Sequence, residues 1–384
     1  MSTNNPLAYM VSSHMAKEIS SQPELWKETY QSIWSQKDGI QAFLSNIFKI
    51  NNLQIILTGA GTSAFIGEIL EHPFFRNTGI PTKAISTTDI VTHPKDFLQQ
   101  SIPTLLVSFA RSGDSPESLA TYELAEKMLE VVYHLVITCN PHGKLSATAL
   151  TSKNSFVFYL PDATNDQALA MTSSFTSLTL AGLLISDIKN IEDNKKNVDI
   201  LVQCGKNILR YYTEKLNEIA ALDFKRIVFL GSGPLKGAAQ ESHLKITELT
   251  DGFIFAHFDS YLGFRHGPKA VLDEYTLLVY LFSGDPYVHR YETDLVKSIN
   301  MEHVLFRIGI GQHSIASGDL EIDLIIDPNR GQDTIPDEYF SICSVLPAQI
   351  IGFYKSLAVG LIPDSPSKNG GIHRVVQGVT IYPY

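Results

Sequence analysis

Three charged residues share one side of a predicted helix, at a spacing that suits proton transfer. The helix follows an apolar strand at 227–230 and the turn Gly231-Ser232-Gly233. Glu241, Lys245 and Glu248 stand at positions i, i+4 and i+7, so their side chains point the same way. Two carboxylates beside one ammonium group could hold a proton and pass it on.

The same spacing is common in solvated ion pairs, which contribute only a few tenths of a kcal/mol. The rest of this helix argues against solvent exposure because it offers little other polar surface. Its apolar residues are Ala238, Ala239, Leu244, Ile246 and Leu249. We therefore expect the three charges to face a cleft.

A loop downstream of this helix adds an imidazole. Residues 264–269 have the sequence Phe-Arg-His-Gly-Pro-Lys, which places His266 before a glycine and a proline. An imidazole can accept and donate protons near neutral pH. His266 could equally be a loop histidine bonded to backbone, and the loop alone does not decide between the two.

Composition limits the partners. The chain has 384 residues, enough for two domains, and its 44% hydrophobic and 18% charged residues are typical of a globular protein. A formal charge of -10 disfavours nucleic acid and anionic membranes as partners. An anionic substrate would then need a local binding site.

Neither a metal nor a cofactor is predicted. Cys139, Cys204 and Cys343 are far apart and form no CxxC pair, which argues against a disulfide framework and against a zinc site. Histidines are scattered without metal-ligand spacing at positions 72, 93, 134, 142, 289, 303 and 313.

Two segments bear on location. The N-terminus has no basic segment followed by an apolar one, so no signal peptide is predicted. Residues 167–186 are uncharged and long enough to cross a bilayer, but they carry many Ser and Thr hydroxyls. We expect a buried helix there, no membrane partner and a cytoplasmic protein.

The first part of the chain is predicted to be helical over residues 7–48. Trp26, Tyr30, Ile33 and Trp34 recur at helical spacing. Such an aromatic stripe usually packs against the body of the protein or against a second subunit.

An apolar run at 53–57 predicts a buried parallel strand. It leads into Thr58-Gly59-Ala60-Gly61-Thr62-Ser63, where the glycines allow a sharp turn whose N–H groups point at whatever lies above the sheet. A second strand at 104–109 leads into the loop 110–117. Strands and helices alternate onward through 133–138 and 156–160, as in a doubly wound parallel sheet.

The loop after the second strand could hold an anion. Ser115 is a suitable N-cap, and Pro116 is a suitable first residue of the next helix. A hydroxyl-rich loop before a helix N-terminus favours negative charge. Ser112 and Ser115 could also be plain turn and cap residues.

The most informative feature is an internal repeat. Three apolar segments recur in register at an offset of 172 residues: 55–61 with 227–233, 104–107 with 276–279, and 132–138 with 304–310. Ser112-Gly113-Asp114 returns as Ser283-Gly284-Asp285, offset by 171 residues. We therefore predict two similar α/β halves, each a doubly wound parallel sheet in three α/β/α layers.

The repeat divides the chain into five predicted parts. These are an N-terminal helical segment (1–48), a first half that binds phosphate (49–191), a helical linker (192–221), a second half with the catalytic helix (222–345), and a C-terminal helix and tail that closes the site (346–384).

The halves differ where chemistry is expected. Opposite Glu241, Lys245 and Glu248, the first half has Ile69, Pro73 and Arg76. Conversely, the second half's loop at 282–286 is poorer in donors than the loop that contains Arg111, Ser112 and Ser115. The hypothesis that follows is a division of labour, with one half holding phosphate and the other performing chemistry.

These residues carry a resemblance. The turn 59–63 and the loops 111–115 and 264–268 resemble the sugar isomerase (SIS) fold, and the tandem pair is similar to the isomerase half of glucosamine-6-phosphate synthase. Segments 56–67, 170–174 and 263–269 resemble more closely the galactosamine-6-phosphate deaminase/isomerase family, also called tagatose-6-phosphate ketose/aldose isomerase. The resemblance covers about residues 20–384.

The resemblance implies a role for each candidate residue. The sugar phosphate would be bound by Thr62, Ser63, Ser112 and Ser115, with Arg111 beside them and with Thr172, Ser173 and Gln377 as further substrate contacts. Glu248 would transfer the proton, Lys245 and Glu241 would be its neighbours, and His266 would open the sugar ring. In relatives that histidine comes from the adjacent subunit, which implies a homodimer, or a dimer of dimers, with the active site at the interface.

Two positions depart from the pattern. Ala110 stands where a serine is frequent, and Gln377, in the tail segment 374–380, stands where the synthase has a lysine. The resemblance therefore does not extend to Schiff-base chemistry at Gln377.

The implied reaction suits these residue types. Ring opening moves a proton from the C1 hydroxyl to the ring oxygen, which an imidazole can do. One carboxylate, Glu248, can then carry hydrogen between C2 and C1 while Lys245 steadies the developing charge. With an amino group on C2, the product is a ketimine that water splits into ammonia and a ketose 6-phosphate.

The resemblance therefore implies conversion of D-galactosamine 6-phosphate to tagatose 6-phosphate and ammonia, in N-acetylgalactosamine and galactosamine catabolism. Release of ammonia is expected because only about 50 residues precede the first half, too few for the synthase's glutaminase domain. A plain ketose/aldose phosphate isomerase remains open, since the residues do not fix the C4 configuration or the need for an amino group.

Two further classes are weighed. Gly59-x-Gly61-x-x-Ala64 could belong to a nicotinamide dehydrogenase, but the acidic residue expected near position 84 is absent, since Ala84 stands there. A non-catalytic sugar-phosphate-binding regulator would not need Glu248, and residues 1–48 show no clear helix-turn-helix.

Overall fold

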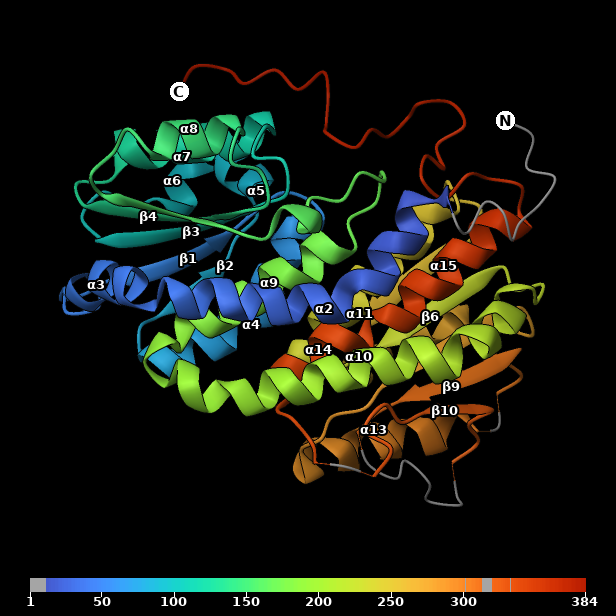
Figure 1. Cartoon of the computed structure of the whole chain (residues 1–384). Coiled ribbons are helices and arrows are strands. Elements are labelled where there is room, and N and C mark those ends of the chain that lie inside the picture. Colours follow the sequence, from blue (N-terminus) through green and yellow to red (C-terminus); the bar gives the residue numbers. More distant parts are fainter. Residues whose placement is uncertain (1–11, 301, 313–319, 332) are drawn as a thin grey trace. The chain divides into compact units, whose positions relative to one another are not determined.

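Two five-stranded parallel sheets form the framework of the chain (Figure 1). The computed structural model describes residues 12–300, 302–312, 320–331 and 333–384. The first sheet contains β1 (Gln54–Thr58), β2 (Thr82–Ala84), β3 (Thr104–Ala110), β4 (Val132–Thr138) and β5 (Ser155–Tyr159). The second contains β6 (Arg226–Leu230), β7 (Phe255–Asp259), β8 (Thr276–Leu281), β9 (Phe306–Ile310) and β10 (Leu324–Ile326).

Both sheets have the same topology. Their strand orders are β2-β1-β3-β4-β5 and β10-β9-β8-β6-β7. In each sheet, the strand that comes first in the sequence (β1 or β6) lies between the strands that come second and third. This order places the switch in winding direction between β1 and β3 in one sheet and between β6 and β8 in the other. Ligands of doubly wound sheets bind at such a point, outside the carboxyl ends of the strands.

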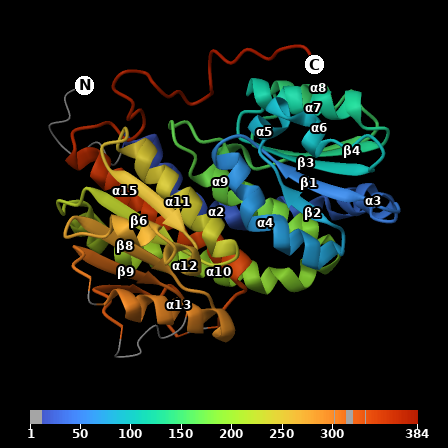
Figure 2. The same cartoon turned by 180° about the vertical axis from the view of Figure 1, so that it is seen from behind.

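Helices cover both faces of each sheet (Figures 1 and 2). On the first sheet, α4 (Thr62–Thr78) and α9 (Ser173–Ser186) lie on one face, and α5 (Thr87–Thr92), α6 (Pro94–Phe97), α7 (Pro116–Met128) and α8 (Lys144–Ala149) lie on the other. On the second sheet, α11 (Pro234–Leu249), α14 (Asp337–Ser344) and α15 (Leu346–Ala358) are on one face, and α12 (Tyr261–Phe264) and α13 (Pro286–Ile299) on the other. The predicted three-layer α/β/α architecture is confirmed.

Within the described residues, the other helices are α2 (His14–Ser35), α3 (Lys37–Ile47) and the 30-residue α10 (Ile191–Ala220), with 3-10 turns η1 (Asp162–Thr164), η2 (Ile188–Asn190) and η3 (Pro268–Val271). Trp26 on α2 is buried and donates to the Thr176 hydroxyl at 2.9 Å. The aromatic stripe is thus packing surface for at least part of its length. The predicted helical start at residue 7 lies outside the described residues.

The internal repeat is also present in the strand pairing. β1 pairs with β3 from Gln54 opposite Thr104, and β6 pairs with β8 from Arg226 opposite Thr276, the same pairing moved by the offset found in the sequence. The turns after β1 and β6 also coincide, because Gly61 has φ 55° and ψ -129° and Gly233 has φ 53° and ψ -128°. A side chain at either position would be strained.

The first glycine of each turn is needed for a different reason. A Cβ on Gly59 would lie 2.6 Å from the Ser63 carbonyl oxygen, and a Cβ on Gly231 would lie 2.3 Å from that of Leu235. Only glycine lets the strand end come this close to the first turn of the helix. The helix N-terminus is therefore held directly above the sheet edge in both halves.

Apolar side chains on the strands bind the helical layers to the sheets. In the second half, Val228, Leu278 and Tyr280 from the strands pack with Phe264 of α12 and Leu295 of α13. The first half has an equivalent cluster, in which strand residues pack against α5 and α7. Both sheet edges that carry candidate residues thus rest on a rigid core.

The uncharged segment 167–186 is a buried helix only in its second part. The helix α9 begins at Ser173, so the prediction was wrong for residues 167–172. Asp166 determines the start, because its carboxylate accepts hydrogen bonds from the amides of Ser173 and Ser174 at 3.2 and 2.9 Å. Every residue of α9 is buried, as expected for this part of the uncharged segment.

Among the described residues, one apolar stretch is long enough to span a membrane. It runs from Asp337 to Ala358 and forms α14 and α15, and 89% of its most apolar 18-residue window is buried inside the chain. Burial of this degree is typical of core helices, and its contacts with α11 give it that role.

The described chain divides into two compact units, each with its own sheet. One unit comprises the described residues within 12–23, 167–172 and 196–371, and the other comprises 24–166, 173–195 and 372–384. The predicted domain limits at 48, 191, 221 and 345 follow the repeat and stay a prediction.

Candidate active site

The charged trio on α11 is buried and forms one ion-paired group. Lys245 Nζ lies 3.2 Å from Glu241 Oε1 and 2.6 Å from Glu248 Oε2. The side chains of Glu241 and Lys245 are 0% exposed, whereas that of Glu248 is 23% exposed. The solvated surface pair is thereby excluded, and Glu248 is the one member of the trio that solvent or a substrate can reach.

The two carboxylates keep Lys245 charged. Burial lowers the pKa of Lys245, but the charges and hydrogen bonds of Glu241 and Glu248 outweigh it and raise the pKa above its ordinary value. Lys245 is therefore an ammonium donor that orients Glu248, and it is unsuited to act as a neutral amine nucleophile.

His266 lies just after α12, on the exposed surface of its unit. Its backbone N–H donates to the Gly263 carbonyl oxygen at 2.9 Å. In the described part of the chain, no hydrogen bond or ion pair joins its imidazole to Lys245 or Glu248. The residue is exposed, and its role in ring opening stays a prediction.

In the first half, the two predicted phosphate-binding segments lie at the carboxyl ends of neighbouring strands. Thr62 and Ser63 begin α4 directly after β1, and Arg111 and Ser112 directly follow β3. Thr58 and Ser108 are paired across these strands, so both segments lie at one edge of the sheet. This is the switch point at which doubly wound sheets bind ligands.

Ser115 caps a helix, as its sequence context predicted. Its hydroxyl accepts the Ser118 N–H at 3.3 Å and lies 2.6 Å from the Ser118 hydroxyl. Pro116 is the first residue of α7. The cap role accounts for Ser115 structurally, and its proposed phosphate contact would come in addition.

The C-terminal tail contacts the predicted phosphate loop (residues 110–117) through Arg374, which was not among the predicted site residues. Arg374 Nε donates to the Asp166 carbonyl oxygen and its Nη2 to Asn165 Oδ1, both at 2.7 Å. The Arg374 carbonyl oxygen accepts a hydrogen bond from Arg111, whose side chain is buried. These contacts link positions more than 200 residues apart, so no local pattern could have revealed them.

The three further predicted contacts have different surroundings. Ser173 donates its hydroxyl to Asp166, Thr172 is buried, and Gln377 is exposed on the tail. The Ser173 hydroxyl is therefore already bound to the carboxylate that caps α9. The substrate contacts of Ser173, Thr172 and Gln377 stay predictions.

The trio and His266 belong to one unit, and the predicted phosphate-binding residues belong to the other. That the two groups form one active site stays a prediction. Among the described residues, no group of three or more His, Cys, Asp and Glu side chains could hold a metal ion.

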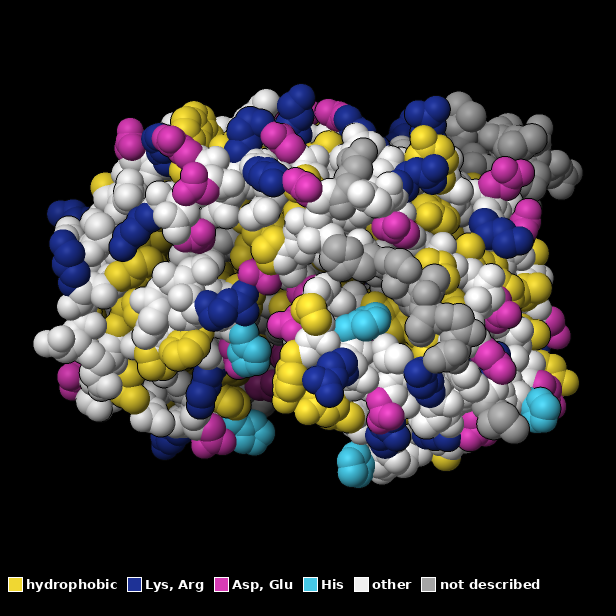
Figure 3. Space-filling model, turned by 90° about the horizontal axis from the view of Figure 1, so that it is seen from below, with side chains coloured by type: hydrophobic (Ala, Val, Ile, Leu, Met, Phe, Trp, Pro, Cys, Tyr) yellow, Lys and Arg dark blue, Asp and Glu magenta, His cyan; other side chains and the backbone are white. Residues whose placement is uncertain are grey.

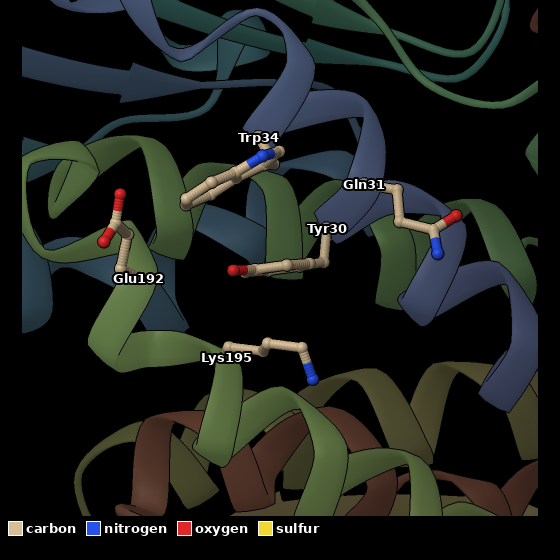
Figure 4. A pocket seen from close by; sticks show the side chains of 5 residues that line it. All are labelled: Tyr30, Gln31, Trp34, Glu192 and Lys195. Atoms are coloured by element: carbon tan, nitrogen blue, oxygen red, sulfur yellow. The ribbon is translucent and has the colours of Figure 1, made fainter.

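One pocket of about 340 Å³ lies in the unit that contains the first sheet (Figure 4). It is lined by Tyr30, Gln31, Trp34, Glu192 and Lys195. The rings of Tyr30 and Trp34 stack with centroids 6.4 Å apart, and Lys37 lies 3.9 Å from the centroid of the Trp34 ring. The pocket contains none of the predicted site residues.

Surface charge agrees with the composition. On the face shown in Figure 3, basic side chains lie among acidic ones, and the coloured residues form no extended basic patch.

Comparisons with known proteins agree with the geometry. No protein-family model matches the chain. It is 40% identical over 375 residues to a protein named D-galactosamine-6-phosphate deaminase AgaS from Shewanella sp. (strain ANA-3), covering 96% of this chain and 92% of that protein. An Escherichia coli protein of the same name is 38% identical over 383 residues, covering 99% and 98% of the two chains.

A solved structure supports the same assignment. The crystal structure of tagatose-6-phosphate ketose/aldose isomerase from Escherichia coli matches with a TM-score of 0.88 and 36% identity over 97% of both chains. The fold and its neighbours define a sugar isomerase (SIS) protein with two tandem α/β halves. More narrowly, the chain belongs to the galactosamine-6-phosphate deaminase/isomerase family, whose members are also named tagatose-6-phosphate ketose/aldose isomerases.

Proposed function

We propose that this chain converts D-galactosamine 6-phosphate to tagatose 6-phosphate and ammonia. The observation that carries the proposal is the trio on α11, in which a buried ammonium group orients the single partly exposed carboxylate, Glu248. An enzyme that moves hydrogen between neighbouring carbons as a proton needs a positioned base, and a partly exposed carboxylate can serve as one. Near full-length relatives named for this deaminase support the choice of substrate.

Phosphate would be held at the edge of the first sheet. Thr62, Ser63, Ser112 and Ser115 would donate hydrogen bonds, and Arg111 would supply the positive charge. The helix N-termini of α4 and α7 at this edge would add favourable dipoles. Arg374, which joins the tail to Arg111 and to Asn165, would fix the guanidinium of Arg111 before substrate arrives.

Chemistry would proceed on the second half. His266 would pass a proton from the C1 hydroxyl to the ring oxygen and open the ring. Glu248 would remove the C2 proton and return it to C1, while Lys245 would stabilise the negative charge that develops. Water would then split the ketimine at C2 and release ammonia.

Substrates would be told apart at C2 and C4. The same steps applied to an aldose phosphate would give plain ketose/aldose isomerisation, the activity for which the Escherichia coli structure is named. The two candidates share every proposed residue, so they differ only in whether ammonia appears.

An ammonia-release assay across a panel of hexosamine 6-phosphates tests the proposal. We expect turnover of galactosamine 6-phosphate to exceed that of glucosamine 6-phosphate, with one ammonia per ketose 6-phosphate. Ketose formation from an aldose phosphate without ammonia would favour the plain isomerase. Binding without turnover of any sugar would favour a sugar-phosphate-binding regulator.

The proposed assembly is a homodimer, or a dimer of dimers, in which His266 serves the site of the neighbouring subunit. The exposure of this side chain supports the proposal. Mixing two inactive variants, Glu248→Gln and His266→Ala, tests it. Activity that returns in mixed dimers would support a shared site, while a mixture as inactive as its components would oppose it. We also propose that the enzyme acts in the cytoplasm, in N-acetylgalactosamine catabolism.

A further inference from the structure

The second sheet has its own loop at the switch point, the counterpart of the phosphate loop. Ser283, Gly284 and Asp285 follow β8, and Pro286 begins α13 just as Pro116 begins α7. The two loops fold alike, because the Ser283 hydroxyl accepts the Asp285 N–H at 3.0 Å and the Ser112 hydroxyl accepts the Asp114 N–H at 3.2 Å. The backbone for a second anion site is therefore present.

In this second loop, hydrogen-bond donors are already bound to a carboxylate of the same unit. Asp337, the first residue of α14, accepts the Gly284 N–H at 2.8 Å on one oxygen and the Ser283 hydroxyl on the other. An amide and a hydroxyl that converge on two oxygens of one group form the pattern by which such loops hold a phosphate. The bound anion here is a side chain of the same protein.

A second acid completes the loop. Glu292 of α13 is 0% exposed, and its Oε2 accepts the Ser283 N–H at 2.9 Å. The Ser232 side chain also hydrogen-bonds to this carboxyl group. Burial raises the pKa of Glu292 to about 8. Two acids of the same unit, Asp337 and Glu292, thus occupy the donors of the second loop.

The first half differs at the corresponding positions. The repeat offset places Asn165 opposite Asp337, and the Asn165 amide oxygen accepts from Arg374. Counting six residues from the helix prolines places Tyr122 opposite Glu292. In the described part of the chain, no hydrogen bond connects the Ser112 hydroxyl to a carboxylate. The first loop is thus open to an external anion where the second is filled.

We propose that the second half contains an anion-binding site of the phosphate-loop type, and that the Asp337 carboxylate is its resident anion. Inorganic phosphate, or a phosphomonoester of similar size, is the class of ligand that this site would take once Asp337 is removed. The inference rests on the proposed function only for the phosphate role of the first loop. It explains why the chain needs one sugar phosphate although it has two loops of the same design.

Thermal unfolding with inorganic phosphate tests the inference. The parent variant is Arg111→Ala/Ser112→Ala, which disables the first loop, and Asp337→Ala is added to it. Phosphate should stabilise the triple variant far more than the parent, relative to chloride at equal ionic strength. We expect its apparent phosphate affinity to be at least about tenfold higher, because two loop donors gain a charged acceptor.

Asp337→Asn in the same parent is the matched control. The amide fills the space of the carboxylate, so this variant should gain no more from phosphate than the parent does. A folded Asp337→Ala variant that also gains no more would overturn the inference. Should Asp337→Ala fold only when phosphate is present, the inference is supported; should it fail to fold with and without phosphate, the inference falls.

The proposed function is judged separately, by comparing wild type with Arg111→Ala/Ser112→Ala. Equal phosphate responses of these two proteins would remove the phosphate role of the first loop. The effect of Asp337→Ala would remain interpretable, since it is measured within one background.

Discussion

The two halves have the same strand order and the same strand register, yet they place charged side chains at different positions. In the first half, the helix after the glycine turn packs Ile69 and Pro73 into its unit, and the loop at the switch point contains hydroxyls and a buried arginine. In the second half, the equivalent helix buries an ammonium–carboxylate pair, and the equivalent loop is closed by Asp337. The two halves thus keep the same strand register and differ in the charged side chains that they bury.

This difference shows which part of the fold is free to change. The strands, the turn glycines and the first helical turns coincide, because they are fixed by backbone contacts. Side chains that point above the sheet edge carry no such constraint, so they determine function. Variants that exchange properties between the halves therefore test the comparison most directly.

The largest effect is expected for Glu248→Gln. The amide keeps the size of the side chain and can still accept from Lys245 at a distance near the present 2.6 Å, but it cannot take a proton. Turnover should fall by about 10²–10⁴-fold while substrate affinity changes little. Steady-state kinetics with a binding measurement checks this, and near-normal turnover would remove Glu248 from the mechanism.

Lys245→Met should cause a large loss of stability. It leaves Glu241 buried without a counter-charge, which costs about 3–5 kcal/mol. Adding Glu241→Ile, the residue type at Ile69 in the first half, should restore most of the loss. Urea unfolding of the single and double variants checks this. A double variant as unstable as Lys245→Met would mean that the cost arises from packing.

The acid in the second loop should make stability depend on pH. Because folding raises the pKa of Glu292 to about 8 from its ordinary 4.5, the folded state retains a proton that the unfolded state loses. Stability from this group is complete below pH 4.5 and declines as the pH rises to about 8, by at most about 1.4 kcal/mol per pH unit. Glu292→Gln should flatten this decline in unfolding experiments from pH 5 to 8. An unchanged slope would contradict the assignment.

Arg111→Ala should weaken affinity more than it slows the bound reaction. Hydrogen bonds to a charged group contribute about 1.5–3 kcal/mol, so KM should rise by at least about tenfold with a smaller change in kcat. Arg374→Ala, which removes the hydrogen bonds to Asn165 and Asp166, should also raise KM, but by less than Arg111→Ala does. Arg76→Ala, at an exposed position on α4, is the control. Equal loss of kcat and kcat/KM would indicate a role in the chemical step.

The smallest effects are expected from the two helix caps. Ser115 caps α7 and Asp285 caps α13, so replacing either with Ala should cost about 1 kcal/mol of stability. Only Ser115→Ala should also raise KM for the sugar phosphate. Thermal unfolding and kinetics of the pair check this, and similar KM changes in both would assign the effect to helix capping alone.

Much of the fold could be predicted because buried parallel strands are continuous apolar runs. The runs at 53–57, 104–109 and 227–230 correspond to β1, β3 and β6 to within a residue or two, and the repeat correctly paired the halves. The strands β2, β7 and β10 were not predicted. They are short or partly exposed and lie at the ends of their sheets, so they lack the apolar pattern of central strands.

The candidate site was predictable only in its local parts. The common direction of Glu241, Lys245 and Glu248 follows from helical spacing, and the capping role of Ser115 follows from its neighbours. The contacts of Arg374 with Asn165 and of Asp337 with Gly284 join residues that are distant in the sequence. Their pairing depends on how loops close over a sheet edge, which neither periodicity nor composition encodes.

The near-identical angles of Gly61 and Gly233 have a practical consequence. Residues 54–78 and 226–249 leave their sheets along the same path, and each begins opposite a threonine of the next strand. The two strand–turn–helix segments are therefore equivalent in backbone path and differ in their side chains. Exchanging them would add the charged trio to one sheet, or remove it from the other, while the strand register and the turn geometry stay the same.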